Sequence, residues 1–95
     1  MVSTDNRLGF IGIIVEDRKK SATKVNEILS DYGDIILARM GVPGGKKGLN
    51  IITLVVDATT DELGALTGRL GKIAGISVKS SLSKPRAGGR DAKYA

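Results

Sequence analysis

The chain has 95 residues, of which 41% are hydrophobic and 26% charged, as is ordinary for one soluble domain with a small core. It has no cysteine and no histidine, which excludes disulfides and removes thiolate nucleophiles and the usual zinc and nickel ligands, so we expect no metal and no cofactor. The formal net charge is +5, but residues 83–95 carry four basic side chains and one acid, +3 of that total. Overall basicity is therefore weak support for a nucleic-acid partner.

No apolar run reaches the roughly 18 residues that a membrane span needs, so we expect no membrane association. The first residues, "MVSTDNR", are polar and lack the core of a signal peptide, which predicts a cytoplasmic protein. A core this small often gains stability from a second subunit, so a homo-oligomer is expected.

The first strand is predicted over residues 8–16, "LGFIGIIVE", where both alternating sets of positions are apolar. Such a strand is covered on both faces. Over 21–32 the period changes to three and four residues, which predicts an amphipathic helix that Gly33 ends. The apolar stripe of this helix is Ala22, Val25, Ile28, Leu29 and Tyr32.

Two strands follow, over residues 34–42 and 49–58, and the second is again apolar on both faces. Thr59 and Glu62 have the spacing of a capping box, which predicts the start of a second helix. Gly75 is predicted to end it. Its apolar stripe is Leu63, Leu66, Leu70 and Ile73.

Three glycines of this second helix, Gly64, Gly68 and Gly71, each cost roughly 1 kcal/mol against alanine. We interpret them as places of close approach to the first helix or to another subunit, in preference to a hinge. Residues 76–83 then alternate apolar and polar, as expected of a half-buried edge strand. Residues 84–95 have no periodicity and are predicted to be a disordered basic tail.

This order of elements is βαββαβ over residues 1–83, a single domain. It predicts an α+β, ferredoxin-like sandwich: an antiparallel four-stranded sheet in the order 4-1-3-2, with two helices on one face. The pattern agrees, because the two strands that are apolar on both faces take the central places and the half-polar strand takes an edge.

The connection between the second and third strands reads "MGVPGGKKGLN" and raises the question of a phosphate-binding loop. A Walker loop has four residues between its first glycine and Gly-Lys, then Ser or Thr, then a helix. Here three residues separate Gly41 from Gly45, Lys47 stands where Ser or Thr belongs, and a strand follows. We predict a surface hairpin loop over 40–49 without bound nucleotide, in which Pro43-Gly44 suits a type II turn.

Three connections meet at one end of the predicted sheet, and basic residues gather in them, whereas the opposite end collects acids. Lysines in loops often only keep a protein soluble, but this end also suits a small anionic ligand. The candidate ligand-binding residues are Asp17, Arg18, Lys19, Lys20, Lys46 and Lys47.

The second sheet face has nothing in this chain to cover it, although the two central strands are apolar on both sides. We therefore expect a homodimer or tetramer that packs sheet faces or extends the sheet edge to edge. The candidate interface residues are Phe10, Ile14, Ile51 and Val55. The other set that this face could carry is Ile11, Ile13, Val15, Ile52, Leu54 and Val56.

The stretch "VEDRKKSATKVNEILSDYGDIILARMGV" resembles the opening of ACT domains, small regulatory modules with this order of elements. Asp17-Arg18 matches the acidic-basic pair of that family, and Lys19-Lys20 stands where the family often has Pro-Gly. Over residues 7–83 the chain is similar to short stand-alone proteins named as regulators of iron-only hydrogenase systems. These in turn resemble the C-terminal domain of nickel-responsive repressors, whose histidine and cysteine ligands have no counterpart here.

The resemblance implies a non-catalytic regulatory module that senses a ligand or binds a partner. The alternative is a small nucleic-acid-binding protein that uses the basic end, although three aromatic residues are few for base stacking. An enzyme is the third class. Glu16 and Asp17 are adjacent and would point to opposite faces of a strand, so they cannot act as a pair.

Overall fold

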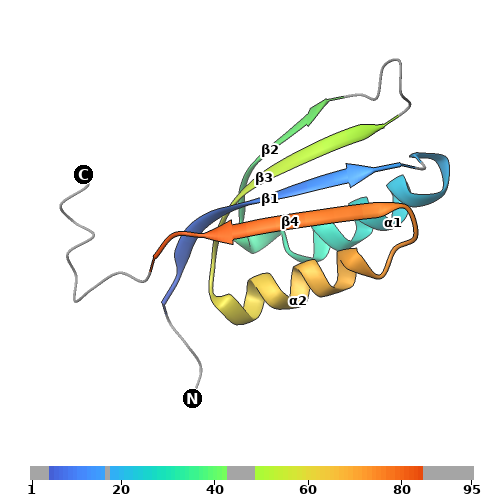
Figure 1. The fold of residues 1–95 in the computed structure, drawn as a ribbon. Coiled ribbons are helices and arrows are strands. Elements are labelled where there is room, and N and C mark those ends of the chain that lie inside the picture. The colour runs from blue at the N-terminus through green and yellow to red at the C-terminus, as the bar shows by residue number, and fades with distance from the viewer. Residues whose placement is uncertain (1–4, 17, 43–48, 85–95) are drawn as a thin grey trace.

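The structure, a computed structural model, describes residues 5–16, 18–42 and 49–84, without the side chains of 18–20. It contains one antiparallel sheet in the order β2-β3-β1-β4, with both helices on the same face (Figure 1). The strands are β1 (Arg7–Val15), β2 (Ile36–Val42), β3 (Asn50–Ala58) and β4 (Ile76–Leu82), and the helices are α1 (Arg18–Asp31) and α2 (Thr60–Gly71). The predicted ferredoxin-like fold and strand order are confirmed.

The core lies between the helices and one sheet face. The two central strands contribute a buried set of Ile, Val, Leu and Ala side chains: Ile11, Ile13, Val15, Leu54, Val56 and Ala58. Against it pack Val25, Ile28 and Leu29 of α1 and Leu66 and Leu70 of α2. The apolar stripes predicted for the two helices therefore face the sheet as expected.

The first helix begins three residues before the predicted start, at Arg18. Arginine and lysine are good helix formers, so the basic stretch that was assigned to a loop forms the first turn instead. The second strand begins later than predicted, at Ile36, because Gly33–Ile35 form a turn of 3-10 helix. That turn buries Ile35 and brings the chain from α1 into the sheet.

The start of α2 agrees with the prediction in detail. The Thr59 hydroxyl accepts a hydrogen bond from the backbone N–H of Glu62 at 3.1 Å, and the Glu62 carboxylate accepts one from the N–H of Thr59 at 2.9 Å. The helix ends at Gly71, before the predicted Gly75, which has a φ of 79° in the turn that leads into β4.

The interpretation of the α2 glycines was wrong with respect to the first helix. A Cβ atom added at Gly64, Gly68 or Gly71 would meet nothing within 4 Å. No close approach inside the chain therefore requires them. The predicted Pro43-Gly44 turn and the tail from residue 85 lie outside the described residues.

Candidate functional site

The open face of the sheet, turned away from the helices, carries the residues predicted for an interface. Cross-strand pairs share a face of the sheet, so the register fixes its three rows. One row is Val42, Ile51, Ile14 and Ser77; the next is Met40, Thr53, Gly12 and Lys79; the third is Ala38, Val55, Phe10 and Ser81. Each row runs from β2 through β3 and β1 to β4.

The apolar part of this face spans three strands and stops at the fourth. The exposed fractions of its large side chains run from 38% at Ile14 to 65% at Met40. On β4 the same face presents only Ser77, Lys79 and Ser81. The open face thus has an apolar side over β2, β3 and β1 and a polar margin along β4.

Of this surface, sequence reasoning found Phe10, Ile14, Ile51 and Val55 but missed the contribution of β2. Met40 and Val42 extend the apolar area to the edge of the sheet, with exposed fractions of 65% and 53%. Their alternation along "ARMGV" was the signal that could have placed them on one face.

The middle row of the open face contains a depression. Gly12 has no side chain, and a Cβ atom built there would reach only the Lys79 carbonyl, at 4.0 Å. Its neighbour on β3 is Thr53, which is smaller than the residues above and below it. The large side chains Phe10 and Ile14 flank this gap along β1.

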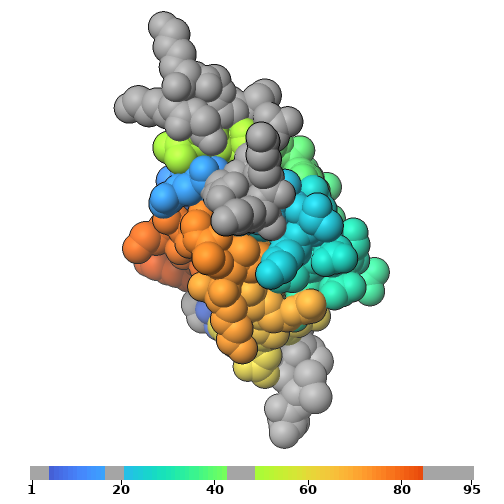
Figure 2. All heavy atoms as spheres, turned by 90° about the vertical axis from the view of Figure 1, so that its right-hand side faces the viewer, coloured from blue at the N-terminus to red at the C-terminus, as the bar shows by residue number. Residues whose placement is uncertain are grey.

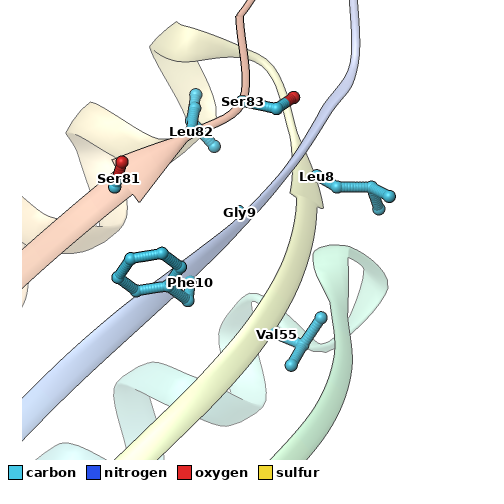
Figure 3. Close-up of a pocket in the computed structure, with 7 residues that line it drawn as sticks. All are labelled: Leu8, Gly9, Phe10, Val55, Ser81, Leu82 and Ser83. Atoms are coloured by element: carbon cyan, nitrogen blue, oxygen red, sulfur yellow. The ribbon is translucent and has the colours of Figure 1, made fainter. Parts of the chain in front are cut away.

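A second hollow, of about 410 Å³, opens where β1 begins and β4 ends. Figure 3 shows the ring of Phe10 and the side chains of Leu8, Val55 and Leu82 around it, with Ser81 and Ser83 at the β4 side. Gly9 also lines this hollow, and β4 approaches its backbone closely. A Cβ atom there would overlap the Ser81 carbonyl oxygen and the side chain of Leu82.

The predicted ligand-binding residues are only partly placed. The backbone of Arg18, Lys19 and Lys20 forms the first turn of α1, whereas Asp17, Lys46 and Lys47 lie outside the described residues. Figure 2 looks onto this end of the molecule, where the starts of α1 and β3 and the connection from α2 to β4 come together. The acids at the opposite end are Asp34, Asp57, Asp61 and Glu62. They lie in the 3-10 turn, at the end of β3 and at the start of α2.

Two contacts fix the elements at the basic end. The buried hydroxyl of Ser21 donates a hydrogen bond to the Ala74 carbonyl at 3.0 Å, which ties α1 to the connection before β4. The Glu16 N–H donates to the Gly75 carbonyl at 2.8 Å, so the end of β1 is held to the same connection. These two hydrogen bonds hold the start of α1 and the end of β1 to the same connection.

The last turns of the two helices are joined by a surface contact. Arg69 of α2 forms an ion pair with Asp31 of α1 at 3.1 Å, and its guanidinium lies 5.5 Å from the centre of the Tyr32 ring. Hydrogen bonding to Tyr32 and to Asp31 raises the pKa of Arg69 above its ordinary value, so its charge is permanent. Both members of the ion pair are about half exposed, and we assign the contact to helix packing.

Among residues 5–16, 18–42 and 49–84, no group of three or more acidic side chains is arranged to hold a metal ion. Within the same ranges no helix is both long and apolar enough to cross a membrane.

Residues 7–80 match a family model described as "TM1266-like: Iron-only hydrogenase system regulator, putative". This chain belongs to that family. A solved relative, the uncharacterized protein TM1266 from Thermotoga maritima, is 40% identical, with a TM-score of 0.81 over 84% of this chain and 100% of the other. The resemblance seen in the sequence is confirmed. A search among curated proteins finds no relative.

More distant solved structures share the fold alone. The ACT domain from the GTP pyrophosphokinase of Chlorobium tepidum is 24% identical, with a TM-score of 0.63 over 80% of this chain and 99% of that domain. A nitrogen regulatory PII-like protein from Thiomonas intermedia K12, solved with ADP, AMP and bicarbonate, is 19% identical, with a TM-score of 0.53 over 81% and 90% of the two chains. Family and fold together identify the chain as a TM1266-like protein with an ACT-like fold.

Proposed function

We propose that this protein is a non-catalytic module that responds to a small anionic ligand and takes part in the regulation of an iron-only hydrogenase system. The family description supports a link to an iron-only hydrogenase system, and the ACT-like fold supports a module that acts by binding. The proposal that the ligand is an anion rests on the residues at the start of α1.

The first turn of α1 contains three basic residues and no acid. The start of a helix has free backbone N–H groups and a partial positive charge, so cations there repel the helix dipole by roughly 0.3–1 kcal/mol each at a surface. An anion bound at this turn would relieve that repulsion and use the free N–H groups. In the sequence, Lys46 and Lys47 lie between β2 and β3, and Asp17 directly precedes the helix. The start of β3 pairs with the end of β1, the strand that leads into α1.

Thermal unfolding in the presence of inorganic phosphate, pyrophosphate and AMP tests this proposal. A ligand at 100 times its Kd stabilises the folded state by about 2.7 kcal/mol, a shift of several degrees in a domain of this size. The variant Lys19→Ala/Lys20→Ala is expected to lose the shift. The control Lys79→Ala/Lys84→Ala removes the same charge from the sheet and from the far end of β4, and should keep it.

Equal shifts in both variants, or none in the unaltered chain with any of the three anions, would show the proposal to be wrong. Binding of generic DNA that weakens steeply with salt and is lost in Lys19→Ala/Lys20→Ala would favour the nucleic-acid alternative.

A further inference from the structure

We infer that a second copy of this chain covers the open sheet face, in a two-fold dimer whose axis runs along β3. The second β3 then lies across the first, and each β2 lies across the other copy's β1. This assembly does not depend on the proposed anion response, because it uses the sheet face and not the start of α1.

The amount of apolar surface favours a partner. Seven large apolar side chains of β1, β2 and β3 belong to the open face and are exposed, which brings its apolar area to about the upper end of the roughly 300–600 Å² that monomers leave open. They are Leu8, Phe10, Ile14, Met40, Val42, Ile51 and Val55. A stable complex buries about 800 Å² on each partner, which this area approaches together with Ala38, Gly12 and Thr53 on the same three strands.

The sizes of the side chains select the direction of packing. Rotation about an axis along β3 keeps each row of the face against the same row of the other copy. Met40, the most exposed of these residues, then lies over the gap at Gly12 of the second copy. Ala38, the smallest side chain of β2 on this face, lies over Phe10. Large side chains therefore meet small ones on both halves of the interface, as close packing requires.

The polar strand agrees with this arrangement. With β3 on the axis, β4 of each copy extends beyond the edge of the other copy's β2. Ser77, Lys79 and Ser81 then form a hydrated rim, where charge and hydroxyl groups lose no water.

A two-fold arrangement with the axis across the strands, along the middle row, fits poorly. It would place Gly12 over Gly12, which leaves a void, and Lys79 over Lys79, which brings like charges together. Two sheets also pack about 10 Å apart with a rotation of about 30°, and the arrangement along β3 allows this without moving β4 into the contact.

Charge substitutions test the face. Sedimentation equilibrium at micromolar concentration should show a dimer of the 9.9 kDa chain. Val55→Asp places two carboxylates against each other near the axis and should raise the dimer Kd at least about 100-fold. The matched control Ser77→Asp puts the same charge on the same face outside the overlap and should leave the Kd within about tenfold.

Exchanging the side-chain sizes at positions 10 and 38 tests the direction in which the two copies pack. Phe10→Ala and Ala38→Phe should each raise the Kd about 10- to 100-fold, the first by leaving a void and the second by a clash with Phe10. The double variant should bind to within about tenfold of the unaltered chain, because residue 38 of each copy faces residue 10 of the other. Circular dichroism should show every variant folded, since both positions are exposed or at the sheet edge.

A monomer at micromolar concentration, or a dimer that Val55→Asp leaves intact, would overturn the inference and leave the anion proposal untouched. Dissociation by Ser77→Asp, or a double variant no better than the single ones, would show that the copies pack in another direction. If the chain forms a tetramer, and the double variant still recovers the affinity that each single variant loses, this interface is one of the contacts of the tetramer and the inference stands.

Discussion

The two faces of the sheet are built from similar residues but end in different surroundings. On β1, Ile11 and Ile13 are completely buried, while Phe10 and Ile14 keep 56% and 38% of their surface exposed. All four are large and apolar and belong to one nine-residue strand. The difference comes from the two helices, which both lie on one side of the sheet.

The covered face holds the monomer together, whereas the open face is available for association. The covered face presents buried Ile, Val and Leu side chains that form one core with the helices. The open face includes Gly12 and Thr53 between its large side chains, so its surface is uneven. Substitutions on the two faces should therefore change different measured quantities.

Leu54 and Val55, neighbours on opposite faces of β3, should give the largest contrast. Leu54→Ala removes a completely buried side chain and leaves a cavity under the helices, which should lower the free energy of unfolding by about 2–5 kcal/mol. Val55→Ala removes a side chain that is 42% exposed and should cost less than about 1 kcal/mol. Urea unfolding, at concentrations low enough that the chain is monomeric, measures both. Equal losses would contradict the division between the faces.

The glycines of β1 should give a smaller contrast of the same kind. Gly9→Ala forces a Cβ atom against the Ser81 carbonyl and Leu82, and overpacking of this sort costs about 1–3 kcal/mol. Gly12→Ala meets open space, so it should be neutral or stabilise by about 0.4–1 kcal/mol through the loss of unfolded-state freedom. Thermal unfolding of the two single variants under dilute conditions measures the difference. A harmless Gly9→Ala would show that β4 does not lie so close to β1.

The sequence was sufficient for the fold because three kinds of signal agreed. The two central strands were apolar on both faces, the helices had clear stripes, and the spacing of Thr59 and Glu62 marked the start of α2. The start of α1 was misplaced by three residues, because the helix was predicted from its apolar stripe and Arg18, Lys19 and Lys20 add no apolar residue to that stripe.

The sequence could not decide which alternating set of the central strands faces the helices, because both sets were apolar. Gly12 and Thr53 interrupt the set that the structure leaves open, but Gly9 interrupts the covered set of β1 in the same way, so the smaller residues did not separate the two faces. The hollow at Gly9 had no signal, because it depends on how closely β4 approaches β1 in space.

The cap of α2 should give the smallest effect of the three, although it supports the helix that covers the buried face. Thr59→Ala removes the hydroxyl that accepts from the Glu62 N–H and should lower the free energy of unfolding by about 1 kcal/mol. Thr60→Ala changes the next residue, which is exposed and inside the helix, so it serves as the control and should change stability by no more than about 0.5 kcal/mol. Because Thr59 lies on the helix side, its loss should lower the urea midpoint without changing the slope or the dimer Kd. A change in the dimer Kd larger than the loss of monomer stability explains would mean that the covered and open faces are coupled, and the simple division between them would not hold.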